Sequence, residues 1–311
     1  MPQPLVKIFS GSASTYLAEK IASDYGQPLG DLTISHFSDS EIGVHFNESI
    51  RGAEVFLVQS TFPPADNLME LMLMIDAAKR ASAHKVIVVM PYYGYARQDR
   101  KDKPRVSIGA KVVANAIQSV GADRLMTCDL HAGQIQGFFD IPVDHLNGSA
   151  IFVPYLRSLN LGNDLIFASP DVGGVVRTRA FAQNFGAEMV VCDKHRKRAN
   201  EIASMQVIGD VEGMDVVLVD DMVDTAGTIT KAAGLLKDKG AKTVRAIATH
   251  PILSGPAYER IENSALEELI VSDTIPLKQE SAKIKVLSFS NLFARAINSV
   301  VTHESISSLF I

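Results

Sequence analysis

Short apolar runs alternate with amphipathic segments along the whole chain. The apolar runs are rich in valine and isoleucine and have the length of strands buried on both faces. The predicted strands are 6–9, 54–58, 86–89, 124–128, 165–168, 188–192, 216–219, 244–249, 269–271 and 284–287. The segments with helical spacing are 12–25, 67–81, 109–120, 172–185 and 228–239. Strands that alternate with helices of this length are typical of βαβ units, so we expect an α/β fold with mostly parallel sheets flanked by helices.

The chain also resembles itself at an offset of about 160 residues. The stretch 51–60 aligns with 212–221, and each is followed by a loop, a predicted helix and a further strand. This predicts two copies of one domain, at 1–147 and 148–311, with the boundary in a polar, turn-prone stretch near Gly148. A chance likeness between two βαβ units is the alternative interpretation.

Three carboxylates and a turn follow the apolar run 216–219. Asp220 and Asp221 come directly after it, and Asp224 precedes the turn 225–228, which opens a predicted helix. The carboxyl end of a parallel strand is the usual ligand-binding crevice of an α/β sheet. N–H groups at a helix start can bind a phosphate, and the aspartates can hold sugar hydroxyls or hydrated Mg²⁺. The alternative is that Asp and Thr merely cap the helix.

The first copy carries different residues at the matching place. Gln59 and Ser60 stand where Asp220 and Asp221 stand in the second copy. We therefore expect that only the second domain keeps an acidic site.

Three stretches of the first domain are more polar than folding alone requires. An aromatic ring followed by acids at 37–41 can stack on a base, or it can form a solvated turn. The loop 91–105 holds three tyrosines and five cations, which suits a nucleotide polyphosphate as well as it suits a solvated loop. The Asp-x-His pair in 128–139 could offer an imidazole to a metal or phosphate, although a lone histidine is more often structural.

Two stretches of the second domain share this character. An acid and two glycines at 169–177 open a helix and would let a diphosphate approach the backbone. Five basic residues in 193–201 predict a mobile basic loop that can close on a transferring phosphoryl group.

Composition narrows the class of protein. The chain has 311 residues, 47% of them hydrophobic and 21% charged, as expected for a globular protein. A net charge of −5 without a long basic run argues against nucleic-acid binding. No apolar run is long enough for a membrane span, and no secretory signal is expected. The two unpatterned cysteines, Cys128 and Cys192, are typical of reduced thiols in a cytoplasmic protein.

Taken together and in this order, the polar stretches resemble the ribose-phosphate pyrophosphokinase family. The resemblance runs from about Ile8 to Phe310, with its most specific motifs at 95–99, 129–139, 171–174 and 219–228. It implies two type I phosphoribosyltransferase-like domains, with a tail of about 295–311 packing back on the first. It also implies Mg²⁺-dependent transfer of the diphosphoryl group of ATP to the 1-hydroxyl of ribose 5-phosphate, with release of AMP.

The resemblance implies roles for single residues. ATP would be bound by a group that includes an adenine site from a neighbouring subunit: Phe37, Ser38, Asp39, Glu41, Arg97, Gln98 and Asp99. The catalytic residues would be Lys194 and Arg196, and the metal residues His131 and Asp171. Ribose 5-phosphate would be bound by Arg196, Asp220, Asp221, Asp224, Thr225, Ala226, Gly227 and Thr228, with Asp220 and Asp221 also near a second Mg²⁺.

The resemblance is to the phosphate-activated class, which implies a hexamer, activation by phosphate and inhibition by ADP. The residues that match the regulatory pattern are Arg51, Ser82, Arg105, Gln136, Asp144, Ser305, Ser307 and Phe310. Ser107 and Gly109 stand where the family more often has a proline and a hydroxyl residue, and Gly133 and His145 are less typical. A non-catalytic homologue that binds active subunits and a phosphoribosyltransferase that consumes the product are the alternatives.

Overall fold

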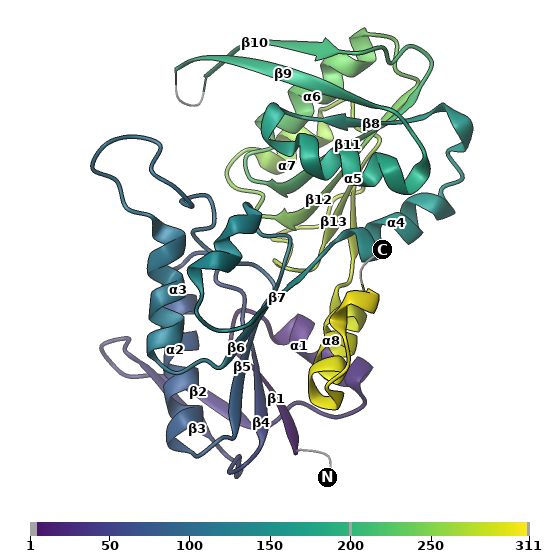
Figure 1. Ribbon diagram of the computed structural model, residues 1–311. Helices are drawn as coiled ribbons and strands as arrows, with labels where there is room; N and C mark the ends of the chain where they lie inside the picture. Colours follow the sequence, from purple (N-terminus) through teal and green to yellow (C-terminus); the bar gives the residue numbers. More distant parts are fainter. Residues whose placement is uncertain (1–4, 199–200, 310–311) are drawn as a thin grey trace. The chain divides into compact units, whose positions relative to one another are not determined.

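The computed structural model describes the backbone of residues 5–198 and 201–309. Within these ranges it describes every side chain except those of Asn163, 194–198, 201–204 and Ser308. The chain forms two compact units, Met1–Gly148 with Phe289–Phe310, and Ser149–Ser288 (Figure 1). Each unit is a mostly parallel sheet flanked by helices, which is the predicted fold class.

The first unit is built on a five-stranded parallel sheet. Its strands, in the order β1-β4-β5-β6-β7, are Val6–Ser10, Glu54–Val58, Lys85–Met90, Arg124–Cys128 and Val143–Leu146. Its helices are α1 (Thr15–Tyr25), α2 (Asp66–Arg80), α3 (Gly109–Ser119) and α8 (Ser290–Thr302), with short 3-10 turns η1 (Gly133–Phe138) and η4 (Ile306–Leu309). The strands β2 (Leu32–His36) and β3 (Ile42–Phe46) form a separate antiparallel hairpin.

Alternation along the strands explains why this sheet has helices on both faces. Side chains two residues apart point to the same face of a strand. Val55 and Leu57 accordingly share one core with Leu71 of α2 and Val113 of α3. Figure 1 shows α2 and α3 on this side of the sheet, while α1 and α8 pack together on the other side.

The second unit has a seven-stranded sheet in the order β10-β9-β8-β11-β12-β13-β14. In that order the strands are Glu201–Ile208, Met189–Arg198, Leu165–Ser169, Asp215–Val223, Thr243–Pro251, Glu268–Ser272 and Ile284–Leu287. Only the β9–β10 pair is antiparallel. The helices are α4 (Ser149–Ser158), α5 (Val175–Phe185), α6 (Gly227–Asp238) and α7 (Ala257–Glu262), with 3-10 turns η2 (Gly162–Asp164) and η3 (Val172–Gly174).

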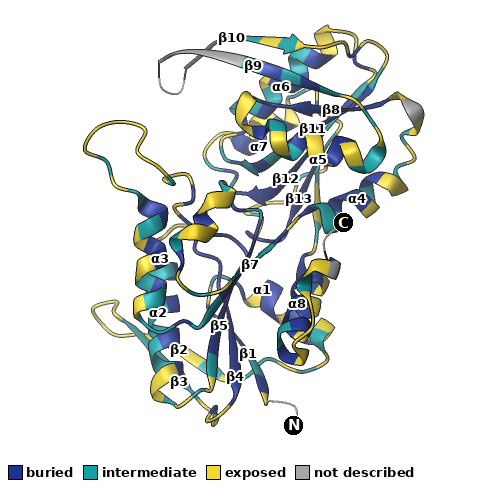
Figure 2. Cartoon of the chain, viewed as in Figure 1, coloured by how far each residue is buried: buried dark blue, intermediate teal, exposed yellow. Residues whose placement is uncertain are grey.

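The central strand β11 is buried on both faces, which explains its continuous apolar run. Val216 and Leu218 belong to the core that includes the apolar sides of α6 and α7. Val217 and Val219 belong to the opposite core, which is formed with α4 and α5. Figure 2 shows the strands of both sheets as buried and the outer helix surfaces as exposed.

The two sheets share one plan. The order β1-β4-β5-β6-β7 in the first unit matches β8-β11-β12-β13-β14 in the second, and both sets are parallel. The helix α2 follows β4 as α6 follows β11. The second unit adds the β9–β10 hairpin at one edge.

The structure corrects two sequence-based expectations. Residues 144–146 of the turn-prone stretch before Gly148 form most of strand β7, because an edge strand can carry polar residues on its open face. The basic segment expected to be a mobile loop continues strand β9 as far as Arg198, because its backbone pairs with β10. Sequence patterns also missed the β2–β3 hairpin and helices α4 and α8. In the ranges that the structure describes, no helix has the length and apolar character needed to cross a lipid bilayer.

Cys192 gives a test of the second core. Its side chain is fully buried, and this burial raises the pKa of the thiol to about 11. A raised pKa favours the neutral thiol in the folded state, so this contribution to stability is present below pH 9 and is lost as the pH rises toward 11. Cys128 is buried as well.

We therefore expect both thiols to react with a thiol-specific reagent at pH 8 at least about 100-fold more slowly in the folded protein than in denaturant. The measurement is a time course of labelling, with the guanidinium-unfolded protein as the control. Prompt labelling of either cysteine in the native protein would contradict the described packing.

Candidate functional site

The acidic residues of the second unit lie where β11 loses one neighbour. Pairing with β8 ends at Leu218, whereas pairing with β12 continues to Val223. Asp220 and Asp221 are therefore the last part of a strand rather than a loop after it, which corrects the sequence-based boundary. Beyond the end of β8 one edge of β11 is open, and this is the crevice in which α/β sheets bind ligands.

Asp171 enters the same crevice from the end of β8. Its Oδ1 accepts a hydrogen bond of 3.2 Å from the N–H of Gly174, which caps η3. Ser169 Oγ donates to the Asp171 carbonyl over 2.6 Å. A Cβ on Gly174 would lie 2.8 Å from Ser169 Oγ, so this turn requires glycine for close packing.

Electrostatics in the crevice are unbalanced toward negative charge. Burial, the adjacent Asp221 carboxylate and Asp171 raise the pKa of Asp220 well above its usual value, while Arg177 lowers it. Arg177 Nη1 lies 3.3 Å from Asp221 Oδ1, and the Asp221 N–H donates to Asp220 Oδ1 over 2.9 Å. One guanidinium serves several carboxylates, so the pocket favours a ligand that brings hydroxyl donors or positive charge.

The same imbalance bears on metal binding. Oxygen donors of this kind suit Mg²⁺, which commonly takes one or two carboxylates and completes its shell with water and substrate phosphates. Among the residues that the structure describes, no three His, Cys, Asp or Glu side chains group closely enough to hold a metal ion by themselves. The donor set thus fits a magnesium ion shared with a phosphate ligand.

The residues Asp224–Thr228, hereafter the 224–228 loop, connect β11 to α6. The carbonyls of Val223 and Asp224 accept from the N–H groups of Leu253 and Ser254 over 3.0 and 2.9 Å. The next residue but one, Ala226, has a φ of +59°, a left-handed conformation that is strained for alanine. The loop therefore has a specific backbone path that ends at the helix start, where N–H groups favour an anion.

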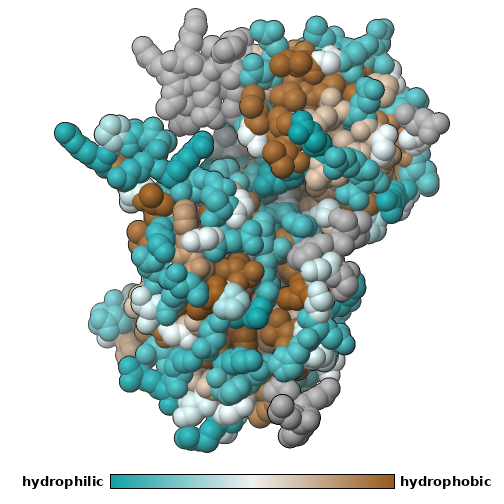
Figure 3. Space-filling view, in the orientation of Figure 1, coloured by the Kyte–Doolittle hydropathy of each residue, from teal (hydrophilic) through white to brown (hydrophobic). Residues whose placement is uncertain are grey.

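In the first unit the structure brings together two of the stretches singled out above. Gln134 Nε2 donates to Asp99 Oδ2 over 3.1 Å, which joins the loop 91–105 to the segment that contains His131. Arg97 and Gln98 are exposed, and a Cβ on Gly109 would lie 2.7 Å from Gln98 Oε1. The loop before α3 stands out from its unit and has a hydrophilic surface (Figure 3).

The stretch 37–41 is the exposed tip of the β2–β3 hairpin. The Phe37 N–H donates to the Glu41 carbonyl over 2.8 Å, and the Glu41 N–H donates to Asp39 Oδ1 over 3.1 Å. These bonds close the tip and leave the Phe37 side chain 62% exposed. A large ring held in solvent on a rigid turn is available to a ligand or to another subunit.

The place in the first unit that matches the acidic crevice is filled by the chain itself. Glu70 is 2% exposed and accepts from Ser12 N, Ser12 Oγ and Gln59 Nε2, each over 2.7 Å. Ser60 Oγ and Thr61 Oγ1 accept from the N–H groups of Tyr92 and Gly94 over 3.1 and 2.8 Å. The first unit therefore uses this edge to brace the start of the loop 91–105.

The remaining predicted site residues are scattered or not described. Phe310 and the side chains of Lys194 and Arg196 lie outside the described residues, although the backbones of Lys194 and Arg196 belong to β9. His131 is exposed in the first unit, whereas Asp171 belongs to the second.

Of the predicted regulatory residues, Arg51 and Ser82 lie together, with Arg51 Nη1 donating to Ser82 Oγ over 3.2 Å. Asp144 pairs with Arg124 over 2.7 Å, and burial raises the pKa of Asp144 while this arginine lowers it. Arg105 is exposed with a φ of +63°. Gln136 Nε2 donates to the Gly133 carbonyl over 3.0 Å, and Ser305 Oγ accepts from the Ser307 N–H over 3.2 Å.

Sequence reasoning assigned no role to Arg177, Glu70 or Arg260. Arg177 was visible as a cation shortly after the Asp-x-Gly-Gly turn, and that spacing could have indicated a partner for the acids. Glu70 and Arg260 are single charges within helical patterns, which normally indicate solvated positions, so no pattern pointed to them.

Known proteins similar to this chain agree with one another. The model for the N-terminal domain of ribose phosphate pyrophosphokinase matches residues 6–121, and the model for the phosphoribosyl synthetase-associated domain matches residues 186–311. The ribose-phosphate pyrophosphokinase of Porphyromonas gingivalis is 58% identical over 97% of this chain and 97% of its own. That of Wolinella succinogenes is 56% identical over 98% and 99%. The crystal structure of phosphoribosylpyrophosphate synthetase from Mycobacterium smegmatis superposes with a TM-score of 0.91 at 38% identity, covering 96% of this chain and 99% of that one.

Replacing Arg177 tests the charge balance of the crevice. Arg177→Met keeps a long apolar stem but leaves the buried Asp221 without its cation, so we expect the free energy of unfolding to fall by roughly 2 kcal/mol or more. Urea denaturation at pH 7 measures this change. Arg179→Met, on the exposed side of the same helix, should stay within about 0.5 kcal/mol of the parent. Equal stability of the two variants would mean that the pair is not significant.

Proposed function

The chain belongs to the family of the ribose-phosphate pyrophosphokinases, and on this premise we propose that it makes 5-phosphoribosyl-1-diphosphate from ATP and ribose 5-phosphate. O1 of the ribose bonds to the β-phosphorus of ATP, and the bond from this phosphorus to the α-phosphoryl oxygen breaks to release AMP. The observation that carries the proposal is the junction of an acidic strand end with the 224–228 loop, in a chain similar to the family along nearly its whole length.

The second unit supplies the ribose 5-phosphate half of the site. Asp220 and Asp221 accept hydrogen bonds from the ribose hydroxyls, which suits a pair of carboxylates at the open edge of β11. N–H groups of the 224–228 loop bind the 5-phosphate at the start of α6. Asp224, Thr225, Ala226, Gly227 and Thr228 form this cradle.

The first unit supplies the ATP half. Arg97, Gln98 and Asp99 bind the nucleotide from the hydrophilic loop that Ser60 and Thr61 brace. Phe37, Ser38, Asp39 and Glu41 bind the adenine of a neighbouring subunit, which is why the Phe37 ring is exposed on its hairpin tip. This arrangement requires a homo-oligomer, for which we propose the hexamer of the family.

The reaction requires positioning and charge stabilisation more than covalent help from the protein. Mg²⁺ would be held by His131 and Asp171 on the ATP side and by Asp220 and Asp221 on the ribose side, where it neutralises phosphoryl charge. Lys194 and Arg196 stabilise the charge that develops on the transferring group, and Arg196 also contacts ribose 5-phosphate. Their backbone positions in the β9–β10 hairpin make them part of a projecting element of the second unit.

Regulation and location complete the proposal. Phosphate activates and ADP inhibits at a site that includes Arg51, Ser82, Arg105, Gln136, Asp144, Ser305, Ser307 and Phe310. The contact between Arg51 and Ser82 supports a shared anion site at that place. The enzyme works in the cytoplasm, where the two unpaired cysteines stay reduced.

The activity is tested by incubating the purified protein with ATP, Mg²⁺ and ribose 5-phosphate and by following AMP. We expect AMP only when all three are present, because hydrolysis of ATP alone would waste the nucleotide. A folded protein that forms no AMP would contradict the proposal and favour a non-catalytic homologue. Formation of a nucleotide from a free base and 5-phosphoribosyl-1-diphosphate would favour a phosphoribosyltransferase, which accounts for the second unit alone.

Asp224→Ala tests the ribose 5-phosphate half. We expect the KM for ribose 5-phosphate to rise about 10-fold or more while the KM for ATP stays within about twofold, because the change removes a contact to one substrate only. Steady-state kinetics with each substrate varied in turn measure the split. Asp238→Ala, which removes an exposed carboxylate at the other end of α6, is the control and should change neither constant. An unchanged KM for ribose 5-phosphate in Asp224→Ala would refute the assignment.

A further inference from the structure

The direction of each N–H group in the 224–228 loop is set by the carbonyl of the preceding residue. A trans peptide is planar, so its C=O and N–H point in opposite directions. A hydrogen bond that holds one carbonyl on one side of the loop therefore aims the next N–H to the other side. For a loop that binds a phosphate through N–H groups, the acceptors of its carbonyl partners matter as much as the N–H groups themselves.

Consecutive carbonyls of this loop are held in this way. Asp224 O accepts from the Ser254 N–H over 2.9 Å, and Ala226 O accepts from Thr230 N and Thr230 Oγ1 over 3.1 and 2.8 Å. Between them, Thr225 O accepts from Arg260 Nη1 over 3.0 Å. The Thr225 carbonyl is thus held by a side chain from a separate helix, α7.

The peptide held by Arg260 is also the one that precedes the strained residue of the loop. Ala226 has a φ of +59°, and an L-residue in the left-handed region costs roughly 1 kcal/mol or more. Without an external hydrogen bond, a rotation of the Thr225–Ala226 peptide would relieve this strain. The bond from Arg260 opposes that rotation and so keeps the Ala226 N–H aimed at the anion.

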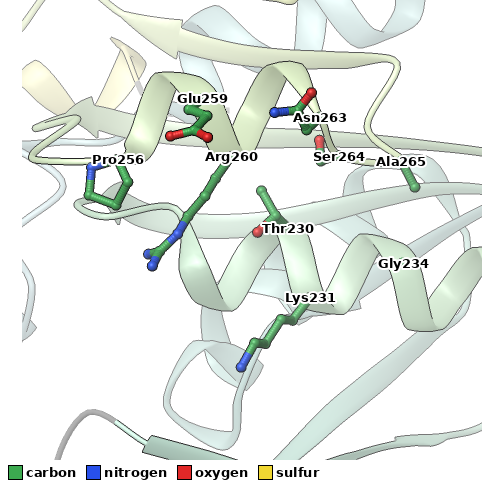
Figure 4. Close-up of a pocket in the computed structure, with 9 residues that line it drawn as sticks. All are labelled: Thr230, Lys231, Gly234, Pro256, Glu259, Arg260, Asn263, Ser264 and Ala265. Atoms are coloured by element: carbon green, nitrogen blue, oxygen red, sulfur yellow. The ribbon is translucent and has the colours of Figure 1, made fainter.

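The surroundings are shaped to admit the guanidinium. A Cβ on Gly227 would lie 3.1 Å from Arg260 Nη1, so a glycine at this position leaves room for the arginine head. Arg260 lines an open groove of about 570 Å³ between α6 and α7, together with Thr230, Lys231 and Glu259. Figure 4 shows its side chain extending from α7 past Thr230 to the N-terminal end of α6.

We infer that Arg260 is a positioning residue for ribose 5-phosphate: it holds the Thr225 carbonyl so that the Ala226 N–H points at the 5-phosphate. The inference rests on the proposed function of the 224–228 loop. It assigns Arg260 to the back of the loop, where the guanidinium acts through the backbone and not by contact with the reacting atoms. The effect is specific to the phosphorylated sugar, because ATP is bound by other residues.

Arg260→Met is the main test, since it keeps the apolar stem of the side chain and removes every donor. We expect the KM for ribose 5-phosphate to rise by about 3- to 10-fold, the loss of a charge-assisted hydrogen bond at an exposed site, with kcat and the KM for ATP within about twofold. Arg260→Lys restores an N–H donor and should recover at least half of the loss on a logarithmic scale. Lys231→Met removes an equal charge from the same groove and should leave all three constants unchanged.

The outcomes separate this inference from the function on which it rests. Absence of ribose 5-phosphate-dependent AMP formation by the parent protein overturns the proposed function. An active parent whose KM for ribose 5-phosphate is unchanged in Arg260→Met overturns the inference alone. An equal effect of Lys231→Met also overturns it, because the groove would then act only through net charge. If Arg260→Met does not fold, the comparison of Arg260→Lys and Arg260→Gln decides, since glutamine keeps a neutral donor on a shorter stem.

Discussion

The direction of a few peptide planes at the end of β11 is the constraint on which the site depends. The strand keeps its β12 partner to Val223 but loses β8 after Leu218, which opens one edge beside Asp220 and Asp221. The 224–228 loop then turns with its carbonyls held by the segment that follows β12 and by α6 and α7. Acceptors at the strand and donors at the helix start thereby lie in sequence order, as a phosphorylated sugar requires.

The same plan is used in both units, but only one of them keeps an open acidic edge. In the first unit Glu70 and Gln59 occupy the matching place, and a carboxylate of the chain accepts the bonds at a position that in the second unit remains open to a ligand. Ser60 and Thr61 then support the neighbouring loop that carries Arg97 and Gln98. The repeat has thus become two different half-sites, one for a sugar phosphate and one for a nucleotide in the proposed reaction.

Sequence patterns predicted most of the parallel strands and the helices between them, because burial on both faces produces continuous apolar runs. They failed at the periphery. Strand β7 contains Asp144 and His145 and was interpreted as a turn, and the basic end of β9 was interpreted as a loop. In both cases backbone pairing with a neighbouring strand determines the structure, and the pattern of one strand carries little information about its partner.

By itself the sequence determined the fold class, the acidic run at 220–224 with its following turn, and the likeness to one family, because these depend on residue order and local composition. The roles of Arg177, Glu70 and Arg260 were decided by the tertiary structure. Arg177 reaches Asp221, which is 44 residues away along the chain, and Arg260 reaches Thr225, 35 residues away. A charge within a helical pattern does not indicate its partner, because that partner is brought near only when strands and helices pack into a sheet with two covered faces.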